Sequence, residues 1–351
     1  MKEKIKLAVF TAKNIATSTG STNTVLNLID SIDDSKVEIN IVTIDNIIPP
    51  NMVLPAEKLK LDPSFIPFST LEANKKISGF YEIEKLTLID LKKIAHCAIV
   101  AIYNTFGEDG KILGFLELAE IPYMSPSLKT SALCFDKQMT KSLLRGSMIS
   151  VPKGFEVHKI NFNLTEFTNM VRKEFSYPVI IKTTSSGASR GISMVNSETD
   201  LSKAVDNAFL FSDEFIVEEF ISGQEFSIGI MGHYLDPKAL PVVEIKSKNQ
   251  FFDFEAKYTT GMADEICPAV ISHELASKIE EIALKSYKAV KATDHARIDI
   301  MHASGKLYVL EINTFPGLTL NSIFPKELKA VGSSLSQFIE QSILQTNQKI
   351  G

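Results

Sequence analysis

The sequence predicts an α/β protein with two or three domains. Its 351 residues exceed what one ordinary hydrophobic core holds. Near the start, an apolar strand over residues 5–10, a polar loop, a helix over residues 23–32 and a strand over residues 37–44 form a βαβ unit. Ligands of such units bind at the loop after the first strand. Far along the chain, two short runs of alternating apolar residues predict an antiparallel hairpin.

Composition and charge narrow the class of protein. Apolar residues make up 44% and charged residues 23% of the chain, which is typical of a globular protein. A net charge of −5 gives no electrostatic reason to bind nucleic acid or an anionic membrane surface, so neither partner is expected. Cys97, Cys134 and Cys267 form no Cys-x-x-Cys pair, which argues against disulfides and zinc. Without a signal peptide or a membrane-length apolar run, a cytoplasmic location is expected.

The remaining elements follow from local patterns. The first helix carries an apolar stripe, and Ser21 or Thr22 is available as its N-cap. Residues 47–77 are rich in proline and are expected to be loops around the first domain. An apolar strand is expected over residues 98–103, and an amphipathic helix over residues 272–290.

The hairpin is expected to pair residues 298–301 with residues 307–312. Strand alternation places Asp299 on one face beside Arg297, and it places Glu311 and Asn313 together on the return strand. The opposite face then holds Ile298, Ile300, Leu310 and Ile312. Carboxylate and amide oxygens suit Mg2+, which completes its shell with water and substrate phosphates. For an isolated hairpin, a polar face exposed to solvent is the simpler interpretation. Arg297 and the tight turn after Asn313 instead favour a site that binds an anion together with a metal ion.

A glycine-rich loop supplies a second candidate site. The strand from Tyr177 ends at Lys182 and runs into Ser185–Gly191, and a second strand follows over residues 192–195. Gly187 and Gly191 let the backbone approach a polyphosphate, while Lys182 adds a point charge. Such a loop is a weak signal alone, but metal ligands downstream favour a phosphate lid. Lys137, in a predicted helix, would by itself be taken for a surface lysine.

Three segments resemble the metal-binding end of D-alanine–D-alanine ligases, members of the ATP-grasp superfamily: Arg297-Ile-Asp299, Leu310-Glu311-Ile-Asn313-Thr and Pro316-Gly317-Leu-Thr319. The resemblance extends from about Ala98 to the C-terminus. It implies a three-domain ATP-grasp fold of the α/β (α+β) class. Its expected parts are a Rossmann-like domain over residues 1–124, a central subdomain over residues 125–215 and a C-terminal domain over residues 216–351.

The resemblance also implies functions for individual residues. The implied metal ligands are Asp299, Glu311 and Asn313, and the implied cofactors are ATP and a pair of Mg2+ ions, with Mn2+ as an alternative. The implied nucleotide-binding residues are Lys137, Lys182, Gly187, Ser189, Glu218, Glu219, Ile221 and Glu225. The implied catalytic and substrate residues are Arg297, Gly317, Ser189, Lys257, Tyr258 and Ser322, of which Arg297 and the Gly317 amide would hold the tetrahedral oxyanion.

The implied reaction joins a carboxylic acid to an amine. The carboxylate attacks the γ-phosphate of ATP, and the amine then attacks the resulting acyl phosphate to form an amide. The expected partners are small amino-acid substrates, with a homodimer as the assembly. Alternatives of other classes are a non-catalytic ATP-binding regulatory protein and, less favoured, a carboxylating or nucleotide-synthesis ATP-grasp enzyme.

One region departs from the family pattern. The family holds the ammonium of the first amino acid with a glutamate in the first loop and a nearby histidine. Residues 11–18 contain no acid, and Tyr103 replaces the histidine. We therefore expect a small amino-acid acceptor, whose carboxylate Lys257 and Ser322 would hold, and a donor acid other than D-alanine. The alternative is a true D-alanine–D-alanine ligase in which another acid, such as Glu108, replaces the missing one.

Overall fold

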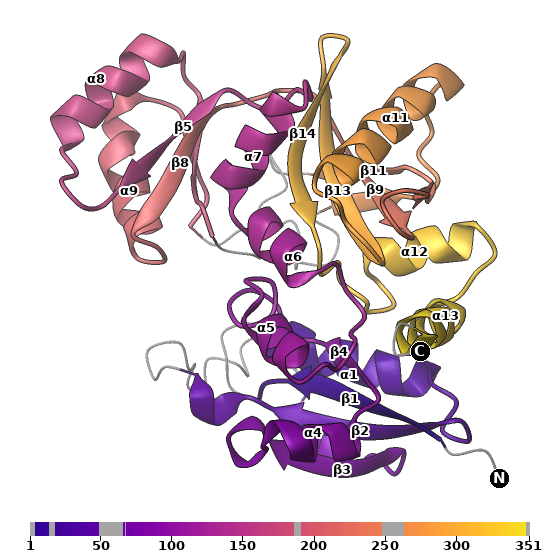
Figure 1. The fold of residues 1–351 in the computed structure, drawn as a ribbon. Coiled ribbons are helices and arrows are strands. Elements are labelled where there is room, and N and C mark those ends of the chain that lie inside the picture. Colours follow the sequence, from indigo (N-terminus) through magenta and orange to yellow (C-terminus); the bar gives the residue numbers. More distant parts are fainter. Residues whose placement is uncertain are drawn as a thin grey trace. The chain divides into compact units, whose positions relative to one another are not determined.

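The computed structural model describes residues 4–13, 18–48, 66, 68–185, 191–247 and 263–348 (Figure 1). The chain divides into two compact units. The first comprises Met1–Lys129 together with Phe315–Gly351, and the second comprises Thr130–Thr314. The C-terminal residues thus group with the N-terminal ones. The domain boundaries expected after residues 124 and 215 stay a prediction.

The first unit contains a parallel sheet with the strand order β3-β2-β1-β4. Its strands are β1 (Ile5–Thr11), β2 (Val37–Thr43), β3 (Ile77–Glu82) and β4 (Cys97–Val100). Strands β1 and β4 are buried along most of their length, as expected where helices cover a parallel sheet. The helical elements of this unit are α1 (Ser18–Ser31), η1 (Asp45–Ile47), α3 (Ser69–Glu72), η3 (Ile83–Lys85), α4 (Leu88–Ile94), α5 (Lys111–Leu118), α12 (Ile323–Ala330) and α13 (Leu335–Gln348).

The predicted βαβ opening is confirmed, but three local details differ. Helix α1 begins at Ser18, so Ser21 and Thr22 lie inside it and the predicted N-cap there was wrong. Strand β3 and helix α4 were not predicted. In β3 the burial alternates at first, but glycine occupies a half-buried position and Phe80 an exposed one, so the sequence shows no apolar alternation. Helix α4 spans only seven residues, too few to show helical periodicity. Most of the expected loop over residues 47–77 lies outside the described residues.

The second unit contains two sheets. The smaller is antiparallel with the order β5-β8-β6-β7. Its strands are β5 (Gly154–His158), β6 (Val179–Thr183), β7 (Ser193–Val195) and β8 (Glu214–Glu219). The accompanying helices are α8 (Leu164–Glu174), η4 (Glu198–Asp200) and α9 (Leu201–Phe209). Its core is rich in phenylalanine rings, among which Phe167 and Phe215 meet edge to face at 5.5 Å between centroids.

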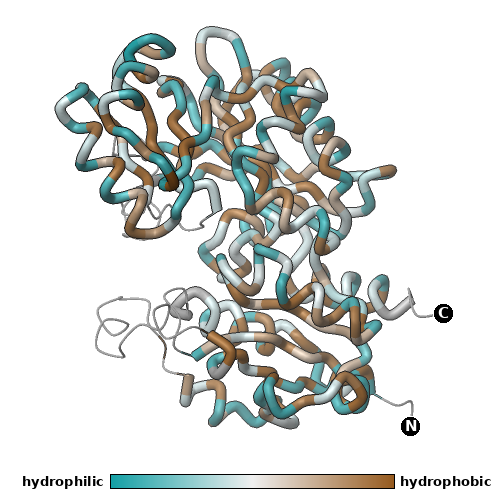
Figure 2. Tube along the Cα trace, turned by 60° about the vertical axis from the view of Figure 1, so that its left-hand side comes forward, coloured by the Kyte–Doolittle hydropathy of each residue, from teal (hydrophilic) through white to brown (hydrophobic). Residues whose placement is uncertain are grey.

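The larger sheet has the order β12-β11-β9-β13-β14, with β10 beside β9. Its strands are β9 (Gln224–Met231), β10 (Lys238–Ala239), β11 (Val243–Ser247), β12 (Ala263–Ile266), β13 (His295–Ala303) and β14 (Lys306–Asn313). Helix α11 (His273–Ala289) packs on this sheet, and Ser272 caps it by accepting the Leu275 amide at 3.2 Å. Hydrophobic stretches of the chain occur in both units (Figure 2). No helix in the described ranges is long and apolar enough to cross a membrane.

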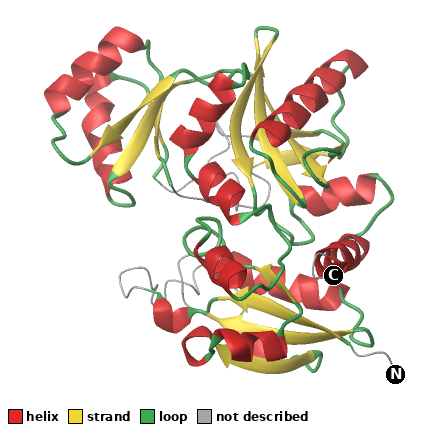
Figure 3. Ribbon diagram, in the orientation of Figure 1, coloured by secondary structure: helices red, strands yellow, loops and turns green. Residues whose placement is uncertain are grey.

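Two short helices precede the smaller sheet, α6 (Leu128–Phe135) and α7 (Lys137–Gly146). The sequence predicted a single helical stretch here. The chain breaks at Asp136, whose side chain caps α7 by accepting the Met139 amide at 2.8 Å. Helix α7 lies between the smaller sheet and β14 (Figure 1 and Figure 3). Its Lys141 side chain contacts Glu218 on β8.

Candidate active site

The β13–β14 hairpin brings four polar side chains together. In the register of the two strands, Arg297 lies opposite Asn313, and Asp299 lies opposite Glu311. Directly opposite residues share a face of the sheet, so the predicted polar face is confirmed. Asp299 is 5% exposed and accepts hydrogen bonds from Arg297 Nε at 2.9 Å and from Arg297 Nη2 at 2.8 Å. Asn313 Nδ2 donates to the same carboxylate at 2.9 Å.

A bulge changes the opposite face of the hairpin. The register shifts after Asp299, so Ile300 pairs with Val309 and not with Leu310. Val309 is therefore fully buried in the core with Ile312, while Leu310 is only half-buried. The prediction that Leu310 lies in the core face was wrong, because strict alternation does not allow for the extra residue of a bulge.

Ser227 is a functional candidate that the sequence did not reveal. It lies on β9 opposite Asp299, is fully buried, and donates its hydroxyl to Asp299 Oδ1 at 2.6 Å. Asp299 thus receives four hydrogen bonds from three side chains, which fix its orientation. A serine between the apolar residues Phe226 and Ile228 is compatible with any half-buried strand, so no local signal identified it.

Helix α7 carries lysines where a helix normally carries apolar residues. Its buried residues are Lys137, Thr140, Lys141 and Leu144, a stripe with the spacing of a core-facing helix. Lys137 is 9% exposed and Lys141 is 2% exposed. The surface-lysine interpretation of Lys137 is therefore wrong. The Lys137 amide also donates to the Thr184 carbonyl at 3.0 Å, which ties the start of α7 to the end of β6.

Glu218 joins the lysines of α7 and β6. Its Oε2 lies 2.9 Å from Lys182 Nζ, and its Oε1 contacts Lys141 Nζ. Glu218 is 3% exposed. Sequence reasoning selected Lys182 and Glu218 but missed Lys141. The available signal was its position four residues after Lys137, on the same face of a helix.

Electrostatic interactions link Glu218, Lys141 and Lys182 to the β13–β14 hairpin. Burial opposes ionisation of Glu218, but Lys141 and Lys182 hold its pKa below the ordinary value. Burial alone would lower the pKa of Lys182, yet Glu218 and then Glu311 raise it. Burial lowers the pKa of Lys141, and the nearby positive charge of Lys182 lowers it further. Because Glu311 acts on Lys182, the polar face of the hairpin and the buried lysines belong to one electrostatic region.

Other predicted residues of the second unit have different surroundings. Glu219 Oε1 accepts the Lys153 amide at 2.7 Å, so its carboxylate supports the end of β8. Ile221 lies half-buried in the loop before β9, and Glu225 lies half-buried on β9. The predicted residues Gly187, Ser189, Lys257 and Tyr258 lie outside the described residues.

Gly317 and Ser322 belong to the first unit and lie close to each other. A Cβ atom on Gly317 would come within 2.7 Å of Ser322 Oγ, so a larger residue would displace that hydroxyl. The Ser322 hydroxyl forms a hydrogen bond with the Thr319 hydroxyl at 2.7 Å. The segment therefore forms a compact turn before α12.

The loop after β4 is tightly wound. Asn104 and Phe106 have positive φ angles of 66° and 77°, and a Cβ on Gly107 would lie 1.8 Å from the Ile102 carbonyl oxygen. Glu108 Oε2 accepts the Asn104 amide at 2.7 Å and so closes the loop. The hydroxyl of Tyr103 lies 2.7 Å from Thr24 Oγ1.

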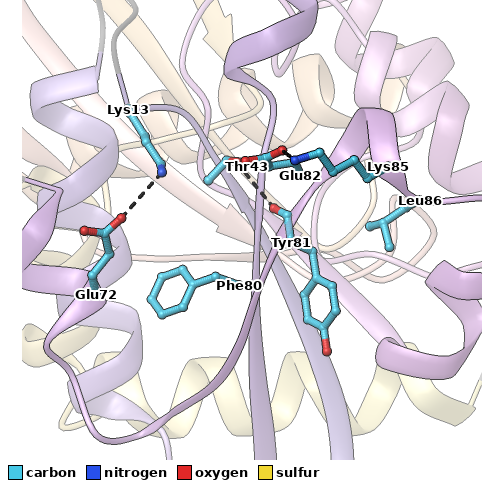
Figure 4. Close-up of a pocket in the computed structure, with 8 residues that line it drawn as sticks. All are labelled: Lys13, Thr43, Glu72, Phe80, Tyr81, Glu82, Lys85 and Leu86. Carbon is cyan, nitrogen blue, oxygen red and sulfur yellow. Dashed lines mark hydrogen bonds and ion pairs between the residues drawn. The ribbon is translucent and has the colours of Figure 1, made fainter.

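A pocket of about 300 Å³ lies at the carboxyl ends of β1, β2 and β3 (Figure 4). Its lining residues are Lys13, Thr43, Glu72, Phe80, Tyr81, Glu82, Lys85 and Leu86. Lys13 Nζ lies 3.5 Å from Glu72 Oε1, and Lys85 pairs with Glu82. Since each cation has an acidic partner, the pocket presents no excess charge that would select a phosphate or a metal.

Known proteins resemble this chain in sequence. The family model for the D-ala D-ala ligase C-terminus matches residues 146–344. The D-alanine–D-alanine ligase of Carboxydothermus hydrogenoformans is 38% identical over 251 residues, which cover 70% of this chain and 80% of the relative. The ligase of Clostridium botulinum is 36% identical over 264 residues, which cover 74% of this chain and 84% of the relative.

Solved structures of such ligases resemble this chain over nearly its whole length. The VanG D-Ala:D-Ser ligase of Enterococcus faecalis superposes with a TM-score of 0.79 at 28% identity, covering 98% of this chain and 100% of that one. The D-alanine–D-alanine ligase of Bacillus anthracis complexed with ATP superposes with a TM-score of 0.73 at 25% identity, covering 100% of both chains. The expected α/β ATP-grasp fold is thereby confirmed. The chain belongs to the D-alanine–D-alanine ligase family.

Proposed function

We propose that this chain is an ADP-forming ligase that uses ATP to join a carboxylic acid to a small α-amino acid. A donor carboxylate oxygen attacks the γ-phosphorus, and the bond between that phosphorus and the β,γ-bridging oxygen breaks to release ADP. The amine of the acceptor then attacks the acyl carbon, phosphate leaves, and the nitrogen loses a proton. Family membership supports this reaction class.

The convergence of buried lysines beside the hairpin supports the proposal most strongly. Lys137, Lys141 and Lys182 are each at most 9% exposed, and Lys141 and Lys182 both contact the buried carboxylate of Glu218. Several buried lysines on neighbouring elements create a positive potential that attracts an anion. A polyphosphate is such an anion, so we assign Lys137 and Lys182 to the phosphates of ATP.

The donor set on the hairpin fits Mg2+. Asp299, Glu311 and Asn313 offer two carboxylates and an amide oxygen, which are hard ligands, and Mg2+ takes few protein ligands beside water and phosphate. In the described part of the chain, no three His, Cys, Asp or Glu side chains gather into a group that could hold a metal by themselves, so Asn313, water and phosphate would complete the shell. When bound, Mg2+ would neutralise charge on the phosphates. We extend the proposal to a pair of Mg2+ ions, with Mn2+ as the alternative.

We infer that the donor acid differs from D-alanine. The segment after β1 lacks an acid, and Tyr103 engages Thr24 through neutral hydroxyls. Glu108, the candidate replacement acid, already accepts a backbone amide of its own loop. An ammonium buried without a carboxylate partner would cost about 3 to 5 kcal/mol. A specialised ligase fits these features, while a true D-alanine–D-alanine ligase remains the alternative.

Steady-state kinetics separate these functions. The assay follows ADP release with ATP, Mg2+ and D-alanine alone, and then with D-alanine plus a panel of other carboxylic acids. We expect efficient turnover only with a second acid. Formation of the D-alanyl-D-alanine dipeptide at a micromolar to low-millimolar KM, the usual range for enzymes, would contradict the altered donor. ATP binding without turnover on any pair would favour the regulatory protein.

We also propose a homodimer and a cytoplasmic location, both expected from the family resemblance and the sequence. Light scattering during size-exclusion chromatography would test the dimer, because a single mass near the 38.8 kDa of one chain would contradict it.

A further inference from the structure

Glu218 has one lysine on each carboxylate oxygen. Lys182 Nζ lies 2.9 Å from Oε2, and Lys141 Nζ contacts Oε1. The side chains of Lys141 and Glu218 are 2% and 4% exposed, so water cannot replace either partner. If one lysine left this carboxylate, the other would have to balance its charge.

The two lysines differ in how firmly they are held. Lys141 lies on α7, whose start is fixed by the Asp136 cap and by the bond from the Lys137 amide to the Thr184 carbonyl. One turn after Lys141, Leu144 is fully buried in the core of the larger sheet. Lys182 lies near the end of β6, its side chain is 10% exposed, and Glu311 on β14 also attracts it.

We propose that Lys141 is a positioning residue that neutralises Glu218, so that the Lys182 ammonium can move from Glu218 to a phosphate of ATP. This inference rests on the proposed ATP-dependent function. Once Lys182 has moved, Lys141 and Glu218 remain as a neutral buried pair. Without Lys141, the move would leave an unpaired buried carboxylate, which is strongly unfavourable. Glu218 would then retain Lys182 and weaken ATP binding.

A double-mutant cycle tests this dependence. Calorimetry would measure the Kd for ATP with MgCl2 in the wild type, Lys141→Met, Lys182→Met and the double variant. In Lys141→Met, Glu218 should keep its charged hydrogen bond to Lys182, so that Lys182 binds the phosphate less well. The free energy of one such bond corresponds to roughly a 10- to 100-fold loss in affinity for ATP. In the Lys182→Met background, Lys141→Met should change the Kd less than about twofold, because Lys141 acts through Lys182. Arg145→Met, an exposed site on the same helix, is the matched control.

The outcomes are distinct. If Lys141→Met binds ATP like the wild type, or if its effect persists fully without Lys182, the proposal is overturned. If the wild type itself does not bind ATP, the proposed function fails instead. Should Lys141→Met not fold, the change is made in a Glu218→Gln background, where no buried carboxylate needs a partner. There it should leave the Kd within about twofold, and a larger loss would overturn the positioning role.

Discussion

Replacing Asp299 by asparagine should destabilise the second unit even without any ligand. Asp299 accepts two hydrogen bonds from Arg297 and one each from Asn313 and Ser227. Asparagine keeps one acceptor oxygen but turns an amide group toward donors that need an acceptor. A hydrogen bond to a charged group contributes about 1.5 to 3 kcal/mol, and breaking a buried ion pair costs about 3 to 5 kcal/mol. With side-chain exposures of 16% for Arg297 and 7% for Asp299, we expect a loss of about 3 kcal/mol.

Thiol labelling measures this loss in each unit separately. Cys134 lies in the second unit and Cys97 in the first, both are buried, and burial raises the pKa of each thiol to about 12. Labelling therefore requires unfolding of the unit. A loss of about 3 kcal/mol corresponds to roughly 100-fold faster labelling of Cys134 in Asp299→Asn. Ser227→Ala removes one neutral donor to the charged carboxylate and should cost about 1.5 kcal/mol, or roughly tenfold faster labelling. If Asp299→Asn labelled within twofold of the wild type, the described hydrogen-bond network would be wrong.

Three further predictions concern the charged residues. Glu311→Gln should abolish turnover while circular dichroism shows an intact fold, since it removes a metal charge; near-normal activity would refute the metal assignment. Lys182→Ala should mainly weaken ATP binding, which a nucleotide titration checks; an unchanged Kd would refute its role. Burial opposes ionisation of Glu218, but Lys141 and Lys182 hold its pKa below the ordinary value of 4.5. The ionised carboxylate therefore stabilises the fold above pH 4.5, and this stability is lost as the pH falls below that value. Glu218→Gln should flatten that part of a pH–stability curve measured by calorimetry, and an unchanged slope would contradict the ion pairs.

Elements with strong periodicity could be predicted from the sequence. The β13–β14 hairpin has apolar residues at alternate positions, and α11 has both an amphipathic stripe and a serine cap at Ser272. Elements without such signals were missed. Helix α4 spans only seven residues, too few to show a stripe, and the capping box of Thr87 and Asp90 at its start is a short pattern that by itself does not establish a helix.

The same limit applies to the candidate site. Asp299, Glu311 and Asn313 could be placed on one face because strand alternation is a local rule. The bulge at Leu310 could not be predicted, since it depends on how β13 and β14 pair. Lysines spaced four residues apart on a helix usually face solvent. Whether they are buried depends on which sheets pack against that helix, and this information is not local.

The buried polar groups have a consequence for stability without nucleotide. Lysines are rarely buried, yet Lys137, Lys141 and Lys182 are, and such exceptions are expected at functional sites. If the phosphates of ATP bind to these lysines, ATP should stabilise the second unit by linkage. At 100 times the Kd, the gain is about 2.7 kcal/mol, or roughly a 100-fold slower labelling of Cys134. Adenosine, which lacks phosphates, is the matched control and at the same concentration should give far less protection. Equal protection by adenosine would mean that the lysines do not hold the phosphates, and that their burial serves the fold alone.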